Sequence, residues 1–398
     1  MPERVHPVHV IVAGAGLGGL TLALALNRAG IDATVVEQAE AFGEAGAGIQ
    51  LSPNATRALF SLGLEAEVRA IGFAPDAAEV RDHRNGRLLL RNRLGGAAED
   101  RWRAPYLQVR RAALHAILLE AVRCQGRVAF RLGSTVETVR DGAVILQCEE
   151  RLTADVIVGC DGVRSRVAAS LFGDQPARFT GQVAWRGVVL ADRLPPETVR
   201  PIARVWTGRE RHFVCYPLGG GGLINFVAVT GEKDWRIESW SEPGVVEALL
   251  EAFDRWPAPV RALIANTDNL FRWALYDRPP RPQWSKGNAT LLGDAAHPML
   301  PFLAQGAGMA IEDAVVLARA LSSGDPVETA LIRYERARRP RTAKVQAWSR
   351  RNAALFHLPG PLAAGAFGAA SALDLLNPGG GAARFDWLYG YDAQNAPL

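Results

Sequence analysis

Cysteines are scarce in this chain, and their spacing excludes the common cysteine-based sites. The four cysteines in 398 residues are Cys124, Cys148, Cys160 and Cys215. They form neither a C-x-x-C redox motif nor a zinc-ligand pattern, so we expect no metal site. We interpret them as free, buried thiols in a reducing compartment, which predicts a cytoplasmic protein.

Long apolar runs and a strong excess of one charge are also missing. No stretch of 18 or more apolar residues is present, so we expect no membrane span. The first predicted strand begins too close to the N-terminus to leave room for a signal peptide. The net charge is only +4 at pH 7, and the arginines are scattered, so nucleic acid is not an expected partner. The length predicts two domains or one large composite.

The most informative feature present is a glycine-rich turn that follows an apolar run. The run ends at Ala13, and Gly14, Gly16 and Gly19 follow with G-x-G-x-x-G spacing. Glu37 ends a second predicted strand about twenty residues later, which completes the dinucleotide-binding fingerprint. Gly14 permits the turn, Gly16 lets a pyrophosphate approach the backbone, and Gly19 lets the helix pack on the strand. A carboxylate at Glu37 favours an unphosphorylated ribose, hence FAD or NAD.

A second motif covers residues 155–166, Asp-Val-Ile-Val-Gly-Cys-Asp-Gly-Val-Arg-Ser-Arg. It predicts a strand that ends at Asp161 and Gly162, with a helix after it. Asp161 can equally be interpreted as a simple helix cap.

A third motif covers residues 291–313 and predicts a strand, a loop stiffened by prolines, and a helix that opens at Gly306. Asp294 ends the strand, where its carboxylate can hold a ribose or ribitol hydroxyl. The helix N-terminus can stabilise negative charge on a reduced flavin. His297 has no other metal ligands near it in sequence, so we interpret it as a structural or flavin-stacking residue.

Together the three motifs resemble the FAD-dependent aromatic hydroxylases, which are single-component flavoprotein monooxygenases, over about residues 8–355. The resemblance implies that Gly14, Gly16, Gly19 and Glu37 hold the ADP half of FAD. It implies that Asp161 and Gly162 serve both FAD and the reduced nicotinamide cofactor, NADH or NADPH. The other FAD contacts that it implies are Gly48, Arg111 near the phosphates and ribityl chain, Val136 near adenine, Asp294 near the ribityl and pyrophosphate, and Gly306, Ala307, Gly308 and Met309 along the isoalloxazine.

Within that family, the chain most resembles salicylate hydroxylases and 3-hydroxybenzoate 6-hydroxylases. The segments that carry this likeness are 46–54, 185–187, 211–218 and 386–391. Hydroxynicotinate hydroxylases share much of it but have a functional histidine where this chain has Gln50. The 3-hydroxybenzoate enzymes have a glutamine where this chain has Pro301.

The resemblance and the predicted elements imply an α/β fold. We expect a Rossmann-like FAD-binding domain built from discontinuous segments, an inserted, mostly antiparallel β-sheet substrate domain, and a C-terminal helical tail. The expected boundaries are 1–75, 103–178 and 268–355 for the FAD-binding domain, 76–102 and 179–267 for the substrate domain, and 356–398 for the tail. The main predicted elements outside the fingerprint are a hairpin that turns at Asn85-Gly86, strands at 183–190, 203–207, 212–217 and 223–230, and helices at 111–122, 243–264, 306–321, 329–357 and 361–376.

Three residues are candidates for acting on a substrate. Strand alternation places His212 and Tyr216 on one face, where both can reach a phenolic oxygen. A base there makes the ring more nucleophilic, and histidine suits that task. Arg186 can bind an anionic substrate bidentately. The competing interpretations are a structural His212 and an ion-paired or surface Arg186, while Trp185, Phe213 and Phe302 are expected in the core.

The resemblance therefore predicts an enzyme that uses NAD(P)H, O2 and a flavin C4a-hydroperoxide to hydroxylate a small aromatic substrate, such as the hydroxybenzoate salicylate. An N-heterocycle or polyketide substrate, or a flavin reductase or dehydrogenase without productive use of O2, are the alternatives. The aromatic C-terminal tail can pack on its own chain or across a homodimer, and we expect the dimer.

Overall fold

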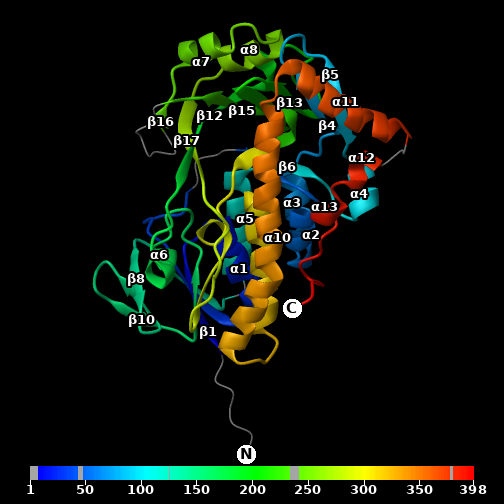
Figure 1. The fold of residues 1–398 in the computed structure, drawn as a ribbon. Coiled ribbons are helices and arrows are strands. Elements are labelled where there is room, and N and C mark those ends of the chain that lie inside the picture. The colour runs from blue at the N-terminus through cyan, green and yellow to red at the C-terminus, as the bar shows by residue number, and fades with distance from the viewer. Residues whose placement is uncertain (1–7, 44–47, 125, 234–241, 377–379) are drawn as a thin grey trace, which may run out of the picture.

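The computed structural model describes residues 8–43, 48–124, 126–233, 242–376 and 380–398. It has two bodies, one below and one above in Figure 1, and the long helix α10 (Val327–Phe356) runs along both. Gly46 and Ala47, which open one of the segments behind the predicted resemblance, lie outside the described residues.

The lower body is built on a five-stranded parallel sheet with the order β18-β11-β1-β2-β7. Its strands are β1 (His9–Ala13), β2 (Asp32–Val36), β7 (Val128–Arg131), β11 (Val156–Gly159) and β18 (Ala289–Leu291). The central strands are buried apolar runs, as expected where helices cover both faces. From β1 the strands are added first on one side, as β2 and β7, and then on the other side, as β11 and β18. This change of side between β1 and β11 opens a crevice at the carboxyl ends of the two strands.

Helices pack closely on this sheet. They are α1 (Leu17–Arg28), α2 (Pro53–Ser61), α3 (Glu65–Ile71), α5 (Arg111–Arg123), α6 (Arg166–Phe172) and α9 (Gly306–Leu321). Helix α1 is buried on nearly all sides because it lies against both α5 and α9. A Cβ at Gly18 would lie 2.8 Å from Leu292 and 3.2 Å from Ala310, so only glycine permits this approach of α1 to α9.

The upper body is an eight-stranded sheet with the order β16-β17-β12-β15-β14-β13-β4-β5. All its neighbours are antiparallel except β13 and β4. The strands are β4 (Ala77–Asp82), β5 (Leu88–Arg93), β12 (Arg178–Leu190), β13 (Ile202–Gly208), β14 (Arg211–Leu218), β15 (Leu223–Gly231), β16 (Glu242–Pro243) and β17 (Leu270–Asp277). The predicted hairpin is confirmed, and Gly86 takes the positive φ of 70° that its turn requires.

The two faces of the upper sheet differ. Phe213, Phe226 and Trp185 pack in one core cluster with Phe253 and Leu263, which belong to the helical segment above the sheet in Figure 1. The opposite face carries Arg186, His212 and Tyr216. The expectation that Trp185 and Phe213 are core residues is confirmed, and Phe302 is buried in a separate cluster on the opposite face.

Smaller elements complete the fold. A two-stranded sheet joins β3 (Gly48–Leu51) to β6 (Leu107–Arg110), and a meander is formed by β8 (Val136–Arg140), β9 (Ala143–Leu146) and β10 (Arg151–Thr153). The tail contains α11 (Gly360–Leu376), α12 (Gly380–Ala383) and α13 (Asp386–Tyr389), and α13 lies near α4 (Gly96–Trp102).

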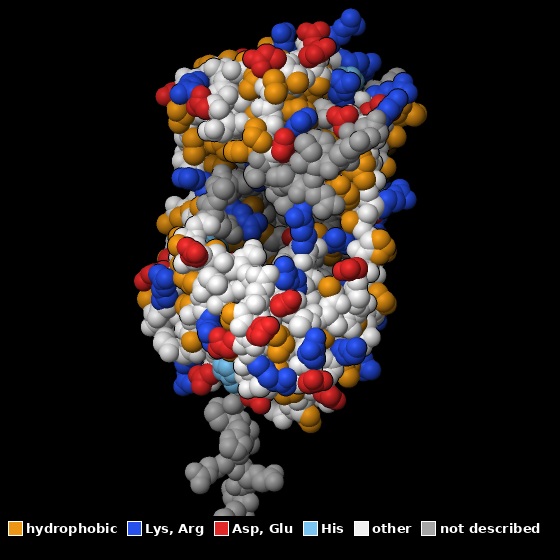
Figure 2. All heavy atoms as spheres, turned by 90° about the vertical axis from the view of Figure 1, so that its left-hand side faces the viewer, with side chains coloured by type: hydrophobic (Ala, Val, Ile, Leu, Met, Phe, Trp, Pro, Cys, Tyr) orange, Lys and Arg blue, Asp and Glu red, His pale blue; other side chains and the backbone are white. Residues whose placement is uncertain are grey.

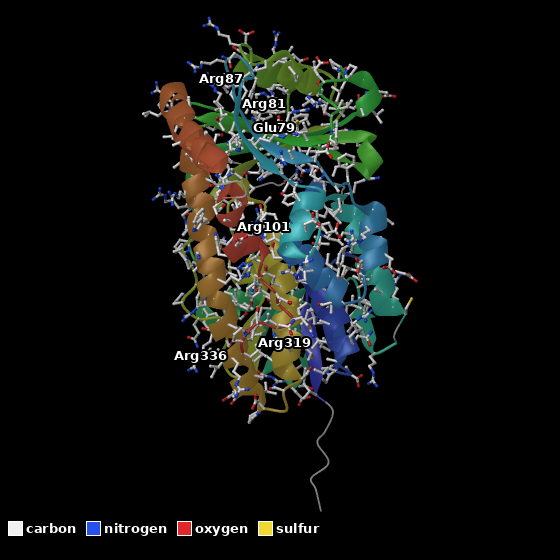
Figure 3. The ribbon with its side chains drawn as sticks, turned by 90° about the vertical axis from the view of Figure 1, so that its right-hand side faces the viewer. Glu79, Arg81, Arg87, Arg101, Arg319 and Arg336 are labelled. Atoms are coloured by element: carbon white, nitrogen blue, oxygen red, sulfur yellow. The ribbon has the colours of Figure 1, made fainter. Side chains whose placement is uncertain are left out.

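The C-terminal residues pack on their own chain. Arg101 and the indole N–H of Trp102 both bind Asp386, at 2.6–2.8 Å, and Figure 3 shows Arg101 on α4 beside α13. Tyr389 meets the Trp102 ring edge-on at 5.0 Å. Arg319 donates to the carbonyls of residues 393 and 396.

Three expectations need correction. The single helix predicted at 243–264 is wrong: it is β16, then α7 (Val246–Ala252) and α8 (Ala258–Ala265), because Pro257 cannot continue a helix. The expected domain boundary at residue 268 assigns β17 to the FAD-binding domain, but β17 pairs with β12 and so belongs to the upper sheet. The cysteines are free, but Cys124 and Cys148 are exposed rather than buried.

Among the residues that the structure describes, no helix is both long and apolar enough to cross a membrane. The predicted α/β class is confirmed.

A buried ion-pair network joins α9 to α10 beneath the crevice. Arg338 Nη1 lies 2.7 Å from Glu312 Oε2, and Arg338 Nε lies 2.6 Å from Asp313 Oδ1, with all three side chains fully buried. Arg341 binds the Glu312 carboxylate at 2.7 Å, and His297 binds Asp313 at 2.5 Å. Burial alone would raise the pKa of both carboxyl groups, but neighbouring positive charges outweigh this effect. The pKa of Glu312 is lowered by Arg341 and Arg338. The pKa of Asp313 is lowered by His297 and Arg338.

We expect Arg338→Met to lower the free energy of unfolding by about 3–5 kcal/mol, because it leaves two buried carboxylates short of a partner. Urea unfolding measures this. Arg333→Met is the matched control: Arg333 lies on the same helix in an exposed pair with Asp325, so its loss should cost at most about 1 kcal/mol.

The pH dependence has a defined sign. Since folding lowers the two pKa values, the network stabilises the protein above the unfolded carboxyl pKa of about 4, and this contribution is lost as the pH falls through the lowered values. The stability gap between the native protein and Arg338→Met should therefore narrow at acid pH. Equal stability of the two proteins at pH 7 would contradict this account.

Candidate functional site

The glycine turn at the end of β1 has the geometry of a dinucleotide cradle. Gly14 has a φ of 104°, and a Cβ there would lie 2.6 Å from the Cys160 carbonyl oxygen. Gly16 has an ordinary φ of −69°, and a Cβ built on it meets nothing within 4 Å. A Cβ on Gly19 would collide with the Gly14 carbonyl. Gly14 and Gly19 are therefore required by the protein itself, whereas Gly16 faces open space that a ligand can fill.

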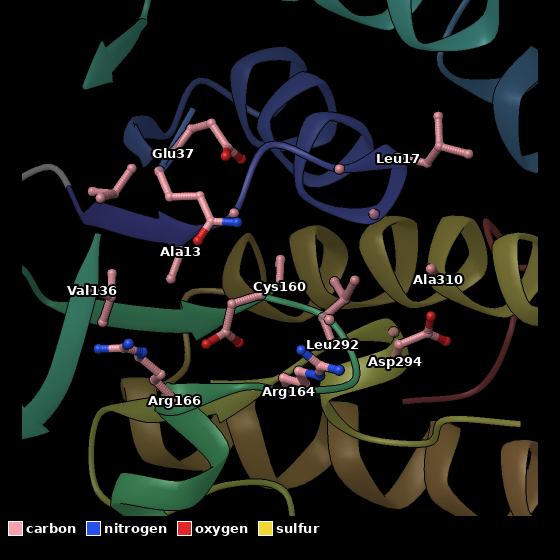
Figure 4. Close-up of a pocket in the computed structure, with 18 of the residues that line it drawn as sticks. Ala13, Leu17, Glu37, Val136, Cys160, Arg164, Arg166, Leu292, Asp294 and Ala310 are labelled. Atoms are coloured by element: carbon pink, nitrogen blue, oxygen red, sulfur yellow. The ribbon is translucent and has the colours of Figure 1, made fainter. Parts of the chain in front are cut away.

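A cleft of about 630 Å³ runs from this turn across the crevice. The predicted cofactor residues that line it are Gly14, Gly16, Glu37, Arg111, Val136, Asp161, Gly162, Asp294, Gly306 and Ala307. Figure 4 shows Glu37 and Val136 toward one end of the cleft and Asp294 and Ala310 toward the other. Residues from all three sequence motifs thus meet in one elongated cleft.

Four predicted cofactor residues do not line this cleft. Gly19 packs against Gly14, as its expected role in helix packing requires. Gly48 lies under the upper sheet, where its N–H donates to Asn225 Oδ1. Gly308 is buried against Gln305 and Ala55. The Met309 side chain is fully buried among the aromatic residues of the tail.

The carboxylates of the cleft are held by nearby donors. Glu37 accepts from the N–H of Ala15 at 2.8 Å, so it is fixed at the end of β2. Asp161 accepts from the Ser165 hydroxyl at 2.5 Å and from the Val167 N–H at 3.1 Å, so the helix-capping interpretation also holds. Burial raises the pKa of Asp161, and its hydrogen bonds oppose this.

Asp294 lies where the cleft meets two smaller cavities, and it lines all three. Burial raises the pKa of its carboxyl group, while His297 and Arg111 lower it. The cradle at Gly16, the fixed acid Glu37 and this second acid fit the ribose, pyrophosphate and ribityl groups of FAD. Those residues would hold the cofactor.

The second cavity, of about 220 Å³, lies between the upper sheet and the loop before α9. It is lined mainly by apolar residues, and its charged residues are Arg186 of β12, Arg164, Arg278 and Asp294. The Arg186 guanidinium stacks on the Trp273 ring, 4.8 Å from its centroid. Its Nε is buried and has no hydrogen-bond partner among the described residues. Burial lowers the pKa of Arg186, and the charge of Arg111 lowers it further.

Tyr216 belongs to a buried polar cluster near Gly48. Its hydroxyl donates to the Gly48 carbonyl at 2.8 Å, and burial raises its pKa to about 12. Tyr106 donates to Gln50 Oε1 at 2.6 Å. Tyr216 is close enough to Arg186 for the arginine's charge to lower its pKa in part.

His212 lies at the far end of the same strand. It is 2% exposed, and its ring meets that of Phe302 at 5.2 Å. Nδ1 of His212 lies 2.8 Å from Nε2 of His357, which follows α10. The structure therefore places Arg186 and Tyr216 near one another, with His212 farther along the strand and beside Phe302.

A third cleft, of about 280 Å³, adjoins both cavities and is rich in arginine. Arg164, Arg166, Arg278 and Arg281 line it, and Asp174 and Asp294 are its acids. Figure 2 shows positive side chains in a hollow on the side of the molecule where α6 lies. An anionic group is the natural ligand of such a cleft.

Sequence reasoning missed several of these residues. Arg164 and Arg166 stand inside the second motif, where the excess of positive charge was a usable signal. Trp273 and Tyr106 carry no local signal, because only the pairing of distant strands brings them to the site. The same is true of His357, which reaches His212 from 145 residues away.

Comparisons with known proteins agree with this geometry. A family model described as "FAD binding domain" matches residues 7–349. The chain is 41% identical to a 3-amino-4-hydroxybenzoate 2-monooxygenase of Streptomyces platensis, over 98% of this chain and 97% of that protein. It is 39% identical to a 3-hydroxybenzoate 6-hydroxylase of Aquipseudomonas alcaligenes, over 86% and 88%. A solved salicylate hydroxylase substrate complex matches with a TM-score of 0.81 and 25% identity, over 97% and 96%.

Alanine substitutions at Gly14 and Gly16 should separate folding from cofactor binding. Gly14→Ala should destabilise the protein itself by about 1–3 kcal/mol, because φ is positive there and the Cβ meets a carbonyl. Gly16→Ala should leave the melting temperature of the FAD-free protein unchanged, yet weaken FAD binding, because the new methyl group occupies the space for the pyrophosphate. Thermal unfolding and FAD fluorescence titration measure the two effects. Normal FAD affinity in Gly16→Ala would show that the pyrophosphate lies elsewhere.

Proposed function

Because the chain belongs to the FAD binding domain family and is an FAD-dependent aromatic hydroxylase with NAD(P)H as co-substrate, we propose that it hydroxylates a carboxylated phenol. Salicylate and the aminohydroxybenzoates are the compounds that we would test first. The observation that supports this substrate class best is the half-buried Arg186 in the cavity beside Asp294, because its Nε is buried without a hydrogen-bond partner among the described residues.

A half-buried guanidinium without a carboxylate partner is costly, since partial burial removes some of the water that stabilises its charge. Arg186 has its Trp273 stack but no ion pair among the described residues. A substrate carboxylate would neutralise it and form a charge-assisted, bidentate contact. The relatives named for 3-amino-4-hydroxybenzoate and 3-hydroxybenzoate point to the same chemical class.

The chain's residues would position the substrate and exclude water. When bound, FAD supplies the oxygen-transfer chemistry. Trp273, Leu275 and Leu300 form an apolar wall, which would keep water from the reacting atoms.

Tyr216 and His212 would take different roles at the phenol. With a pKa of about 12, Tyr216 stays protonated near neutral pH, and its hydroxyl proton is already donated to Gly48. It can accept a hydrogen bond from the substrate but is not a base. His212 is neutral at pH 7, because burial and then His357 lower its pKa well below 6.5. We therefore assign the proton-accepting role to His212.

The arginine-lined cleft is our candidate site for the phosphates of NADH or NADPH. It adjoins both the FAD cleft and the substrate cavity, and the three share Arg164 and Asp294. The chain has one G-x-G-x-x-G fingerprint, so side chains must hold the second dinucleotide. Arg281 contributes a buried Nε without a hydrogen-bond partner among the described residues.

The remaining assignments are also proposals. With the boundary at residue 268 moved past β17, the predicted FAD-binding domain would bind the cofactor and the predicted β-sheet domain would bind the substrate. The free cysteines favour a cytoplasmic protein. Leu362 of α11 is 62% exposed, which favours a partner surface and so the homodimer; light scattering would measure the mass in solution.

Arg186→Met should remove substrate binding while sparing the fold. We expect the KM for hydroxybenzoates to rise about 30-fold or more, because a buried charge pair is worth about 2–5 kcal/mol. The melting temperature of the substrate-free protein should stay level or rise, since a partly desolvated, unpaired charge disappears. Steady-state kinetics and calorimetry measure the two quantities.

Arg272→Met is the matched control. Arg272 stacks on Trp185 at 5.3 Å on the opposite face of the same sheet. Its loss should leave the KM unchanged. If both variants keep the native KM, Arg186 does not bind the substrate. Should the enzyme then hydroxylate N-heterocycles that lack a carboxylate, these compounds would replace the hydroxybenzoates as candidate substrates.

Arg281→Gln should raise the KM for NAD(P)H about tenfold, because one charge-assisted hydrogen bond is worth about 1.5–3 kcal/mol. FAD affinity should not change, since Arg281 does not line the FAD cleft. Arg336→Gln, an exposed arginine on α10 (Figure 3), removes the same charge elsewhere and should have no effect. If Arg281→Gln leaves the KM unchanged for both NADH and NADPH, the arginine-lined cleft does not bind the nicotinamide cofactor.

A further inference from the structure

We propose that the C-terminal segment 385–391 helps to build the active site by fixing the orientation of Gln50, whose amide N–H donates a hydrogen bond to a ring oxygen. The proposal rests on the proposed function, because that oxygen belongs to the phenolic substrate or to the flavin. It gives a role to the aromatic segment 386–391, which the proposed function leaves unused. Gln50 would touch the ring, whereas Tyr106 and Tyr389 are positioning residues.

Gln50 lies between the substrate side of the upper sheet and the end of the cofactor cleft where α9 begins. Two residues before it, Gly48 is so close to Tyr216 that a Cβ would lie 2.8 Å from the tyrosine ring. Two residues after it, Ser52 accepts a hydrogen bond from the Gln305 amide at 2.8 Å. Helix α9 begins directly after Gln305, and its first residues line the cleft. Because a strand advances about 3.3 Å per residue, the Gln50 backbone lies about 7 Å from both Gly48 and Ser52.

The hydroxyl of Tyr106 determines which amide atom of Gln50 is left for a ligand. It donates to Gln50 Oε1 at 2.6 Å. Gln50 pairs with Gln108 of β6, and Tyr106 stands two residues before Gln108, so Gln50 and Tyr106 are diagonal neighbours on one face of the small sheet. Burial raises the pKa of Tyr106 well above its usual value of 10, so the hydroxyl keeps its proton and needs an acceptor. Oε1 of Gln50 is therefore occupied, and Nε2 is left as a donor.

The Nε2 atom of Gln50 is available to a ligand. Gln50 is half-buried, and among the described residues its Nε2 is neither bonded nor buried. An amide that offers only N–H selects an oxygen acceptor, such as a phenolate or a flavin carbonyl, and not an amine. Directly opposite, Gln108 has both amide atoms buried without a partner in the described part of the chain. Gln108 is thus a competing partner for Gln50, and the hydrogen bond from Tyr106 opposes that pairing.

The C-terminal segment holds Tyr106 in place. The Tyr389 ring meets that of Tyr106 edge-on at 6.1 Å, and both rings belong to one buried cluster. The segment is itself fixed by Arg341 of the ion-pair network, which donates to the carbonyls of residues 387 and 388 at 2.9 Å. The ion-pair network therefore holds the tail, the tail holds Tyr106, and Tyr106 orients Gln50.

The first test compares Gln50→Met with the native holoenzyme, each saturated with 3-amino-4-hydroxybenzoate or 3-hydroxybenzoate at one fixed pH. We expect the ratio of bound phenolate to bound phenol, read from the ultraviolet difference spectrum, to fall about 10- to 100-fold, because one hydrogen bond to a charged oxygen is lost. If the flavin carbonyl is the acceptor instead, the phenolate ratio stays level and the reduction potential of the substrate-free flavin falls. If neither quantity changes, the proposal is overturned.

The second test asks whether Tyr106 and the tail act through Gln50. Tyr106→Phe removes only the hydroxyl, lets the Gln50 amide turn to Gln108, and should move the same quantity in the same direction. The double variant with Gln50→Met should then be no worse than Gln50→Met alone, whereas additive losses would show that Tyr106 does not position Gln50. Tyr389→Leu should give a smaller change of the same kind, and no change at all would remove the tail from the site.

Tyr334→Phe is the matched control for stability. The Tyr334 hydroxyl is also buried, and it donates to the Leu291 carbonyl at 3.0 Å. Tyr334→Phe and Tyr106→Phe should lower the melting temperature to a similar extent, but only Tyr106→Phe should change the phenolate ratio or the flavin potential. If the native enzyme binds neither hydroxybenzoate, the proposed function fails, and the flavin potential alone decides the role of Gln50. Normal hydroxylation with both quantities unchanged in Gln50→Met removes only the present proposal.

Discussion

The buried contact of Arg338 with Glu312 and Asp313 is the interaction on which the rest of the site depends. Asp313 also accepts from the N–H of Gly293 and binds His297, so it fixes the turn that carries Asp294. Glu312 accepts from Asn54 at 2.6 Å, which links α9 to the segment after Gly48. Arg338 lies on α10, which continues to His357 beside the upper sheet. One ionic contact thus sets the relative positions of the cofactor cleft and the substrate face.

The three cavities meet where this network holds the chain. Asp294 lines all of them, and Arg111 acts electrostatically on both Asp294 and Arg186. A dinucleotide in the large cleft, an anionic ring in the apolar cavity and a second dinucleotide in the arginine-lined cleft would therefore meet at one point. This convergence is what a reaction among three partners needs, since proximity and orientation supply much of its rate.

The sequence predicted the cofactor cleft well, because its residues follow a local rule. Gly14, Gly16 and Glu37 belong to one strand-turn-helix-strand unit with fixed spacing, so their proximity could be inferred without knowing the rest of the fold. The parallel strands were predicted for a similar reason, since they are continuous apolar runs. The helix predicted at 243–264 failed because a proline at 257 outweighs the apolar pattern.

The substrate side could be predicted only in part, because it depends on long-range pairing. Alternation along β14 placed His212 and Tyr216 on one face, but not their partners. Register across β12 and β17 decides that Arg186 lies beside Trp273, and the path of α10 decides that His212 meets His357. No local pattern in the sequence encodes either contact.

The most direct test of the central claim is the dissociation constant of the native holoenzyme for salicylate or 3-amino-4-hydroxybenzoate, measured against the matching carboxamide. The two ligands have nearly the same shape and differ in charge. We expect the carboxylate to bind about 30-fold or more tightly, as a desolvated pair with Arg186 would give. Equal affinity for the two ligands would contradict the account.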